Sequence, residues 1–369
     1  MFLQKLSLIN FKNYHEAELS FSEKINCFVG NNGEGKTNLL DAIYYLSFCK
    51  SYFNAMDSQN ILNDAPFFVI QGTYVKDEAT PDVVYCSQKR NQRKQFKINK
   101  KEYERLADHI GLFPLVMISP ADSELITGGS EERRKYIDSV ISQFDKFYLD
   151  DLLNYNKALY QRNSLLKRFA ESRSFEKESL EIWDKQLVEL GNRIHAKRSA
   201  FLESFIGIFS KYYEFVSGGK EKVNIIYDSQ LHSGEFEKLL NNSLDRDRAL
   251  LYTTVGIHKD DLSFWIEKYP LKKFGSQGQQ KSFIIGMKLA QFDYMKDIKG
   301  YKPVLLFDDI FDKLDHLRVE QLMKLVSQQS FGQVFITDTH PERIAEVFKN
   351  IDTECRIFEI INGTAQLKS

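Results

Sequence analysis

Short apolar segments with strand periodicity occupy both ends of the chain. Near the N-terminus, Phe2 to Asn10 alternates apolar and polar residues, which predicts a strand, a turn and a second strand near Ala17–Phe21. The further segments that we predict as strands are Ile25–Val29, Phe67–Val75, Asp82–Cys86, Pro114–Ser119, Val223–Tyr227, Ser263–Glu267, Pro303–Asp308 and Gln333–Thr337. The last two are continuous apolar runs, which are typical of buried parallel strands.

A long helical pattern separates these two groups of strands. Residues 131–190 contain no Gly and no Pro. Apolar residues recur there, and in the residues that follow, at i, i+3, i+4 spacing: Ile137, Val140, Ile141, Phe144, Phe147, Tyr148, Trp183, Leu187, Leu190, Ile194, Phe201, Phe205, Phe209 and Tyr212. We predict at least two long helices with a break at Glu171–Ser174 and an end at Ser217-Gly218-Gly219. Because one face is polar, the helices are expected to form an antiparallel arm.

The order of these patterns predicts an α/β head that is split by a helical insertion. We expect residues 1–125 to form the N-terminal part of the head, 126–220 the arm and 221–369 the C-terminal part that completes a mixed sheet. A chain of 369 residues is long enough for two or three domains.

The segment Gly30-Asn31-Asn32-Gly33-Glu34-Gly35-Lys36-Thr37 follows the strand Ile25–Val29 and precedes a helical pattern that begins at Asn38. Its form, G-x-x-x-x-G-K-T between a strand and a helix, is that of a phosphate-binding loop. Backbone N–H groups of such a loop face the phosphates of ATP, Lys36 is expected to reach the β- and γ-phosphates, and the Thr37 hydroxyl is expected to bind Mg²⁺. An ordinary Gly-rich turn is the alternative.

The strand Pro303–Asp308 ends in two carboxylates, Asp308 and Asp309. An acidic residue delivered by a strand beside a phosphate loop holds Mg²⁺ in related sites. We therefore assign Asp308 to the metal, through water, and Asp309 to the attacking water as general base or orienting group. An acidic turn after a strand is the alternative for this pair.

A second candidate anion site precedes this strand. Ser276-Gln277-Gly278-Gln279 opens a predicted helix over Lys281–Phe292, and the N-terminus of a helix carries free N–H groups. A turn with a simple helix cap is the alternative. Further along the chain, Lys313-Leu314-Asp315 and the segment Thr337–His340 follow the acidic strand, and His340 is equally consistent with a plain surface histidine.

Composition limits the partners and the compartment. The net charge is −1, so nucleic-acid binding requires local basic patches. The most basic segment is 89–105, where eight cations stand against two glutamates: Lys89, Arg90, Arg93, Lys94, Lys97, Lys100, Lys101 and Arg105. It suits either a DNA backbone or a solvated sheet edge. Four scattered cysteines and the absence of a long apolar run are expected of a reduced, cytoplasmic protein without a membrane span.

A second basic cluster, Arg133-Arg134-Lys135, leaves two interpretations open. It is consistent with a DNA contact, and equally with intramolecular pairing to Glu131, Glu132 and Asp138.

Several of these segments, in this order, resemble the SMC/Rad-fifty branch of the ABC ATPases, and within it the bacterial RecF family. The resemblance covers nearly the whole chain. Its segments are Leu8–Tyr14, Gly30–Asn38, Ser119–Asp122, Gly128–Asp138 and Gly256–Leu262. Ser276–Gln279 corresponds to the ABC signature motif, Asp315 to the D-loop and His340 to the switch histidine. The departures are Lys12 in place of arginine, Ala121 in place of glutamate, Ser130 and Ile257 in place of proline, Asp312-Lys313 before the D-loop, and Ser119 near the position of the Q-loop glutamine.

The resemblance implies a P-loop ATPase head and a function in recombinational gap repair. Lys12, Asn13 and Asn38 would join the phosphate loop at ATP, and Ser276–Gln279 would contact the ATP of a second subunit in a head-to-tail homodimer. Such proteins bind double-stranded DNA and single-strand/double-strand junctions, act with RecR and RecO, and help to load the recombinase RecA. Slow hydrolysis separates the dimer.

Three other classes share parts of this pattern. A transporter ATPase subunit lacks a long helical insertion, and a cohesin-like SMC protein needs a far longer coiled coil. A small-molecule kinase does not need the signature segment before the acidic pair. Another SMC-like repair ATPase, or an ABC-type ATPase subunit of unrelated role, stays open as an alternative.

Overall fold

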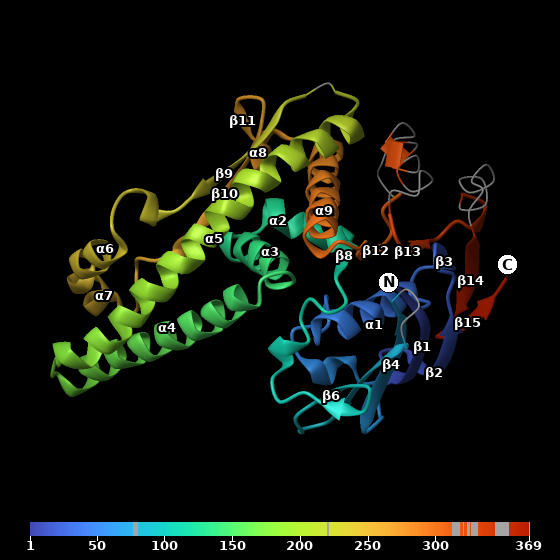
Figure 1. Ribbon diagram of the computed structural model, residues 1–369, viewed down its shortest axis with the longest axis horizontal. Helices are drawn as coiled ribbons and strands as arrows, with labels where there is room; N and C mark the ends of the chain where they lie inside the picture. The colour runs from blue at the N-terminus through green and yellow to red at the C-terminus, as the bar shows by residue number, and fades with distance from the viewer. Residues whose placement is uncertain are drawn as a thin grey trace. The chain divides into compact units, whose positions relative to one another are not determined.

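The computed structural model describes residues 1–76, 80–219, 221–311, 318–319, 321–322, 325, 331–343 and 354–368. The chain divides into two compact units. Unit 1 contains residues 1–123, 211–220 and 276–369, and unit 2 contains residues 124–210 and 221–275. Figure 1 shows the elements of both units.

Unit 1 contains an antiparallel sheet in the spatial order β2-β1-β4-β5-β6-β7. Its strands are β1 Phe2–Phe11, β2 Tyr14–Ser20, β4 Phe67–Val75, β5 Asp82–Lys89, β6 Gln95–Ile98 and β7 Lys101–Glu102. One face is buried: along β1, Leu3, Leu6 and Leu8 are inaccessible to solvent. The alternating pattern that predicted these strands therefore reports a sheet with a single apolar face.

A second sheet of unit 1 has the order β15-β14-β3-β13-β12-β8. Its strands are β3 Ile25–Val29, β8 Leu115–Ile118, β12 Val304–Phe307, β13 Val334–Asp338, β14 Cys355–Ile361 and β15 Thr364–Leu367. All neighbouring pairs are parallel except β14 with β15. The continuous apolar runs at β12 and β13 are fully buried, as expected of parallel strands covered on both faces.

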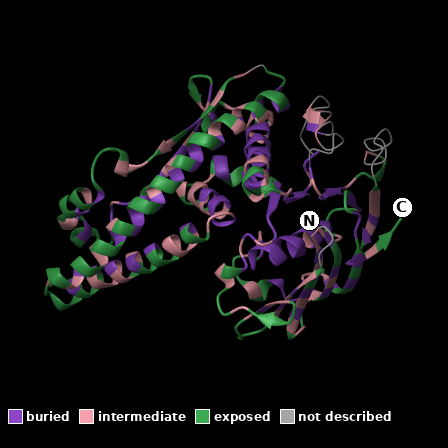
Figure 2. Cartoon of the chain, in the orientation of Figure 1, coloured by how far each residue is buried: buried purple, intermediate pink, exposed green. Residues whose placement is uncertain are grey.

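Two helices pack against the sheets of unit 1. Helix α1, Lys36–Phe48, contacts β4 and β5 of the first sheet and β8 and β13 of the second. Helix α9, Gln277–Lys299, packs against β8. Most residues of both helices are buried, which Figure 2 shows as continuous purple along α1 and the greater part of α9. Helix α1 is therefore a core element that fixes the end of β3 relative to both sheets.

Unit 2 is built on long helices and a small antiparallel sheet in the order β11-β10-β9. Its elements are α2 Glu124–Thr127, α3 Ser130–Ser142, α4 Lys146–Ser172, α5 Lys177–Ser217, α6 Phe236–Asn242, α7 Leu244–Leu250, α8 Leu271–Phe274, β9 Val223–Asp228, β10 Asp261–Ile266 and β11 Tyr269–Pro270; the last residues of α5, 211–217, belong to unit 1. Single 3₁₀ turns lie at Asp57–Asn60, Leu106–Asp108, Pro120–Ser123, Gln230–His232 and Ile257–Lys259.

Helices α4 and α5 form the predicted antiparallel arm. Cross-helix ion pairs join Arg162 to Asp184 at 2.6 Å and Arg193 to Asp151 at 2.7 Å, so positions late in α4 meet positions early in α5. The break between the helices falls at residues 173–176, next to the predicted Glu171–Ser174. Arg173 has a φ of 52°, which ends α4 in a left-handed cap.

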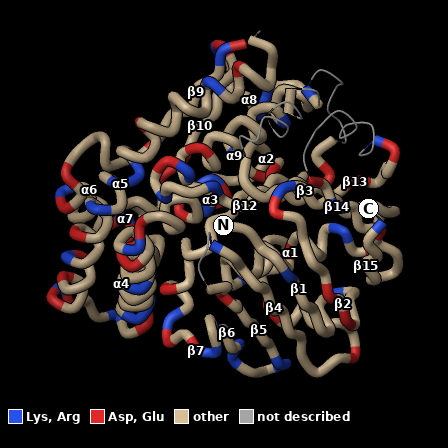
Figure 3. Tube along the Cα trace, turned by 45° about the vertical axis from the view of Figure 1, so that its right-hand side comes forward, with Lys and Arg blue, Asp and Glu red and all other residues tan. Residues whose placement is uncertain are grey.

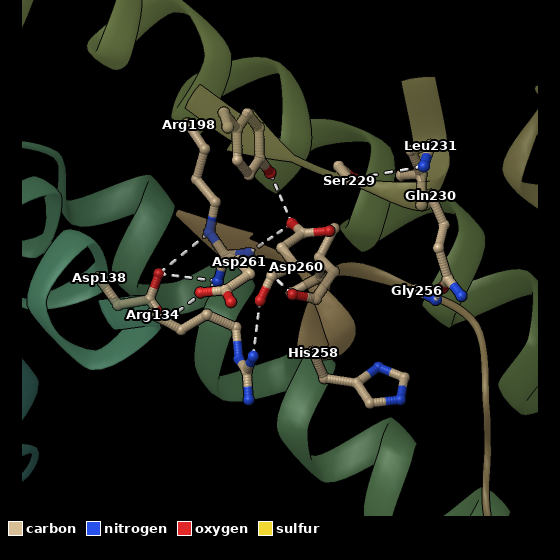
Figure 4. A network of polar contacts seen from close by, with 12 residues as sticks. Arg134, Asp138, Arg198, Ser229, Gln230, Leu231, Gly256, His258, Asp260 and Asp261 are labelled. Atoms are coloured by element: carbon tan, nitrogen blue, oxygen red, sulfur yellow. Dashed lines mark hydrogen bonds and ion pairs between the residues drawn. The ribbon is translucent and has the colours of Figure 1, made fainter. Parts of the chain in front are cut away.

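The compact units differ from the domains expected from sequence in two respects. Residues 211–220 were expected in the arm, but they belong to unit 1. Residues 221–275 were assigned to the C-terminal part of the head, but they belong to the same unit as the helical arm. The physical reason is an ion-pair network between α3, α5 and the segment before β10 (Figure 4). Arg198 contacts both Asp138 and Asp260, and Arg133 contacts Asp261. The strands predicted at Val223–Tyr227 and Ser263–Glu267 are present as β9 and β10. Periodicity could not show that these strands pack with the helical arm.

Candidate functional site

The phosphate loop lies between β3 and α1, as predicted, and is supported by neighbouring segments. The Asn13 amide donates to the Glu34 carbonyl at 2.8 Å, and the Tyr14 hydroxyl donates to the Gly35 carbonyl at 3.1 Å. The Asn38 amide donates to Asn13 at 2.8 Å. Asn13 and Tyr14 thus hold two carbonyls of the loop, and Asn38 holds the Asn13 side chain in place.

Two glycines of the loop are required by their surroundings. At Gly30, φ is 151° and an added Cβ would lie 2.4 Å from the Ile360 carbonyl oxygen on β14. At Gly35, φ is 118° and a Cβ would lie 2.6 Å from the Asn13 amide nitrogen. Because L side chains rarely adopt such φ values and no space is present, larger residues at either position would displace the loop.

Lys36 and Thr37 begin α1 at the centre of the site. The Lys36 ammonium donates to the carbonyls of Gly30 at 2.7 Å and Asn31 at 2.8 Å. Burial lowers the pKa of Lys36, and the nearby carboxylates of Asp309 and Asp308 oppose this shift. The charge of Lys36 is thus held against the loop at the place where phosphates are expected.

Asp308 follows β12 and receives three hydroxyl donors. Its Oδ1 accepts from Thr37 at 2.8 Å and from Thr337 at 2.9 Å, and its Oδ2 accepts from Ser119 at 3.4 Å. Burial raises the pKa of Asp308, and the hydrogen bonds from Thr37 and Thr337 counteract the increase. The structure therefore joins the predicted metal ligands Thr37 and Asp308 in one contact.

Asp309 and Thr337 complete the cavity at the loop. Its volume is about 150 Å³, and its lining residues are Asn32, Gly33, Gly35, Lys36, Thr37, Asn38, Asp309 and Thr337. The Asp309 backbone N–H donates to the Thr337 hydroxyl at 2.9 Å. The donor set around Thr37 is made of oxygens, which suits Mg²⁺. Within the described residues, no group of three or more His, Cys, Asp or Glu side chains offers an alternative metal site.

Ser276 caps helix α9 in a full capping box. Its hydroxyl accepts from the Gln279 N–H at 3.2 Å, and the Gln279 side chain accepts from the Ser276 N–H at 2.7 Å. Ser276 and Gln277 are exposed, while Gly278 and Gln279 are half-buried. Both interpretations from sequence, a cap and an anion-facing helix terminus, are compatible with this geometry.

The signature segment does not line the phosphate-loop cavity. Gln277 instead lines a neighbouring cavity of about 310 Å³ together with Ser119, Gln280, Asp308 and Asp309.

Two candidate residues point elsewhere. Lys12 forms an ion pair with Asp41 of α1 at 2.6 Å, so its ammonium is engaged by a carboxylate of this helix. His340 is exposed, and its ring contacts Thr339 at 2.9 Å and Arg343 at 2.8 Å. The predicted D-loop residue Asp315 lies outside the described residues.

Asp338, at the end of β13, was missed in the sequence analysis. It is buried, it accepts from the His340 N–H at 2.7 Å, and its charge acts on Lys36. Its sequence signal, an acid that ends an apolar run, is the same as that of Asp308.

The basic segment 89–105 runs from the end of β5 through β6 and β7, and Figure 3 shows blue Lys and Arg segments there, with red acidic segments among them near β7. Lys89, Arg90, Arg93, Lys100 and Lys101 are exposed. Lys97 is half-buried and lies 3.9 Å from Glu102. Lys94 differs from the others, because its ammonium is turned inward to Asp57 at 2.7 Å. Lys94 is therefore a structural cation and is not available to a phosphate backbone in this conformation.

The second basic cluster is mainly engaged within unit 2. Arg133 forms a bidentate pair with Asp261 at 2.6 and 3.0 Å, and Arg134 donates to the Asp260 carbonyl at 2.6 Å. Only Lys135 pairs with the neighbouring Glu131 and Glu132. The intramolecular interpretation thus describes this cluster, with mostly different partners from those expected.

Comparisons with known proteins agree with this geometry. The model of the RecF/RecN/SMC N terminal domain family matches residues 2–365. The chain is 52% identical to the DNA replication and repair protein RecF of Phocaeicola vulgatus over 364 residues, which cover 98% of this chain and 97% of the relative. It is also 52% identical to the protein of the same name from Flavobacterium johnsoniae over 360 residues, covering 98% and 100%.

Solved structures give the same result. A structure of the recombination mediator protein RecF-ATP in the RecFOR pathway superposes with a TM-score of 0.88 at 32% identity, and covers 100% of this chain and 99% of that chain. A Pyrococcus furiosus Smc head domain shares the fold, with a TM-score of 0.59 at 18% identity, covering 100% and 96%. By sequence, by fold and by the arrangement of its phosphate loop and acidic strand, this chain belongs to the RecF family of SMC-like ATPases.

Proposed function

We propose that the chain is an ATPase of DNA replication and repair that binds DNA as an ATP-dependent dimer. The observation that carries the proposal is the contact of 2.8 Å between Thr37 and Asp308 beside Lys36. A phosphate loop whose hydroxyl meets a strand-end carboxylate is the arrangement used for nucleotide with Mg²⁺. Relatives named as DNA replication and repair proteins, and a relative solved with ATP, support the same function.

In this proposal each residue of the site has a distinct role. Backbone N–H groups from Gly30 to Thr37 and the Lys36 ammonium bind the phosphates. Thr37 and Asp308 would hold Mg²⁺, which neutralises phosphate charge when bound. Asp309, which lines the cavity, orients water and accepts its proton.

The small size of the cavity at the loop supports the proposed dimer. Its volume of about 150 Å³ is smaller than the roughly 300–1,000 Å³ that enclose drug-sized ligands. Ser276–Gln279 does not belong to its lining, although Ser276 presents an exposed helix terminus. We infer that the signature segment of a second copy closes the nucleotide site.

Changing Ser276 to Arg tests the dimer directly. We expect ATP binding to persist and dimers formed with a slowly hydrolysed ATP analogue to disappear, because a bulky cation would occupy the interface. Size measurement by light scattering gives the result. Ser233→Arg, at an exposed serine of unit 2, adds the same charge and volume and should dimerise normally. Unchanged dimers of Ser276→Arg would contradict the proposal.

For DNA, we propose that the exposed cations of β5–β7 contact the backbone without sequence preference. Replacing Arg93, Lys100 and Lys101 by Glu should weaken duplex binding and reduce its dependence on salt. Each phosphate contact that is lost lowers the number of counterions that binding releases from the DNA. Fluorescence anisotropy across a salt series measures both quantities. Reversing Lys238 and Lys268, which are exposed in unit 2, is the control. An unchanged salt slope in the triple variant would remove this surface from the interface.

We also propose protein partners for the chain. The naming of a relative in the RecFOR pathway supports RecR and RecO as partners. RecA, as the recombinase that is loaded, is proposed from the family resemblance alone. Binding of purified RecR to the chain with and without ATP and DNA would test the first of these.

The helices of the described residues include none with the length and apolar character needed to cross a bilayer.

A further inference from the structure

A buried ion pair joins helix α9 to the segment that follows β8. Lys288 of α9 places its ammonium 2.6 Å from Asp122, and the two side chains are 6% and 3% exposed. The Tyr52 hydroxyl donates to the same carboxylate and accepts from Lys288 at 3.3 Å. Because a buried carboxylate requires a compensating charge and hydrogen bonds, Lys288 and Tyr52 together determine where Asp122 lies.

Asp122 in turn holds Ser119 in contact with the proposed metal ligand. Its Oδ2 accepts from the Ser119 N–H at 2.8 Å, and the Ser119 hydroxyl donates to Asp308 Oδ2 at 3.4 Å. The other oxygen of Asp308 accepts from Thr37 and Thr337. The two oxygens of Asp308 are therefore oriented by different parts of unit 1, and the contact to Oδ2 depends on a chain of polar contacts that begins on α9.

Tyr52 connects the same chain to helix α1. Its backbone N–H donates to Asp41 of α1 at 2.7 Å, and the Ser51 hydroxyl donates to the second oxygen of Asp41 at 2.6 Å. Asp41 is fully buried and paired with Lys12. The polar chain thus spans from the helix that starts at the phosphate loop to the helix that starts at Ser276.

We propose that Lys288, Asp122 and Ser119 form a positioning relay that orients Asp308 for a divalent cation bound with nucleotide. The relay makes the metal affinity of the site depend on contacts made by helix α9, whose N-terminus carries Ser276. The proposal rests on the proposed function, in which Asp308 holds the metal. Groups that orient a metal ligand typically change metal affinity by about 10- to 100-fold when they are removed.

The relay predicts a pattern of metal affinities that a purely structural ion pair does not. Mn²⁺ binding to the full chain with a non-hydrolysable ATP analogue can be titrated by electron paramagnetic resonance. We expect Lys288→Met and Ser119→Ala each to weaken Mn²⁺ binding about tenfold. The double variant should be no weaker than the weaker single variant, because both changes break the same path. Ser119→Thr keeps the hydroxyl and should restore the affinity.

A matched control comes from a second inward-facing ion pair of unit 1. Lys94 lies 2.7 Å from Asp57 and, like Lys288, also contacts a tyrosine hydroxyl. Lys94→Met removes a comparable pair whose partners are Asp57, Tyr45 and the Cys49 carbonyl, and not Asp122 or Ser119, so its Mn²⁺ affinity should equal that of the wild type. If Lys288→Met does not fold, Tyr52→Phe removes one hydrogen bond to Asp122 and should shift the affinity in the same direction by less.

Three results would decide against the relay. Wild-type Mn²⁺ affinity in Lys288→Met, or in Tyr52→Phe if that variant has to be used, would show that the path does not reach Asp308. Additive effects in the Lys288→Met and Ser119→Ala double variant would show two independent paths. If the wild-type chain binds no Mn²⁺ with nucleotide, the proposed function is refuted, and the relay with it. The wild-type titration shows this result before any variant is compared.

Discussion

The Thr37 hydroxyl lies 2.8 Å from Asp308 Oδ1, although 271 positions separate the two residues. The parallel sheet produces this contact. β13 pairs with β3 on one side and with β12 on the other, so the strand that ends at the phosphate loop and the strand that ends at Asp308 finish at the same edge. The hydroxyl of Thr337 on β13 fills the gap between them. The register of the strands thus brings the residues of the site together. The role of each residue can be tested by its own substitution.

Lys36→Ala should weaken nucleotide binding by about tenfold to a hundredfold. The estimate corresponds to the loss of a hydrogen bond to a charged group, which is worth about 1.5–3 kcal/mol. Titration with a fluorescent ATP analogue measures the affinity. Lys5→Ala, at an exposed position of β1, is the control and should bind normally. An affinity of Lys36→Ala within twofold of the wild type would exclude Lys36 as a phosphate partner.

Asp309→Asn should retain ATP binding and lower turnover by about 10²–10⁴-fold, the usual contribution of a general base. Asp309 has a φ of 49°, and Asn tolerates this left-handed conformation as well as Asp does, so the change isolates the carboxylate. The resemblance to ABC ATPases implies that many relatives have Glu at the position of Asp309. Because Asp is one methylene shorter and is expected to place water less well, wild-type turnover should lie well below about 10 per second. Phosphate release assays test both values. Equal turnover in the variant would assign the base elsewhere.

The local motifs and most strands could be predicted because their signals are local. The phosphate loop and the acidic pair depend on residue types at fixed spacing, and the buried strands β8 and β12 appear as continuous apolar runs. Both helices begin within the motif that was expected to open them: α1 begins at Lys36, before the predicted Asn38, and α9 begins at Gln277, before the predicted Lys281.

Contacts between residues that are distant in sequence could not be predicted from local patterns in the same way. The strand β14 lies beside β3 and blocks a Cβ at Gly30, yet nothing in the local sequence of Cys355–Ile361 indicates that neighbour. Arg133 stands next to two glutamates in sequence but pairs with Asp261, because α3 and the start of β10 are packed together. Lys94 sits in a basic segment and still turns inward, since Asp57 offers it a half-buried carboxylate. Charge patterns alone do not distinguish these outcomes.

Arg198→Met should destabilise unit 2 by about 3–5 kcal/mol, which is the usual effect of leaving a buried carboxylate without its partner. Arg198 and Asp260 are each 1% exposed and lie 2.8 Å apart. The adjacent residue of α5 supplies the control: Lys197 pairs with Asp145 but is 55% exposed, so Lys197→Met should change stability by at most about 1 kcal/mol. Urea unfolding measures both. Equal effects would show that the Arg198 network contributes no more than a surface pair.

Two histidines, the buried His109 and the half-buried His258, should make the chain sensitive to acid. His109 of unit 1 and His258 of unit 2 each accept from a tyrosine hydroxyl at Nδ1, from Tyr103 at 3.0 Å and Tyr155 at 2.8 Å. Each donates from Nε2 to a backbone carbonyl, at 2.6 Å and 3.0 Å. This pairing requires the neutral ring, and burial lowers the pKa of both histidines from 6.5 to about 4.

The unfolded chain therefore binds more protons than the folded chain between pH 6.5 and 4, and stability is complete above this window and falls as the pH drops through it. Each histidine accounts for about 3 kcal/mol over the full interval. His109→Gln and His258→Gln should each be less stable at pH 7, yet lose less stability between pH 6.5 and 4 than the wild type. Urea unfolding at several pH values gives the slopes, with His15→Gln, at an exposed position of β2, as the control. If both variants lose stability between pH 6.5 and 4 as steeply as the wild type does, other groups cause the acid sensitivity.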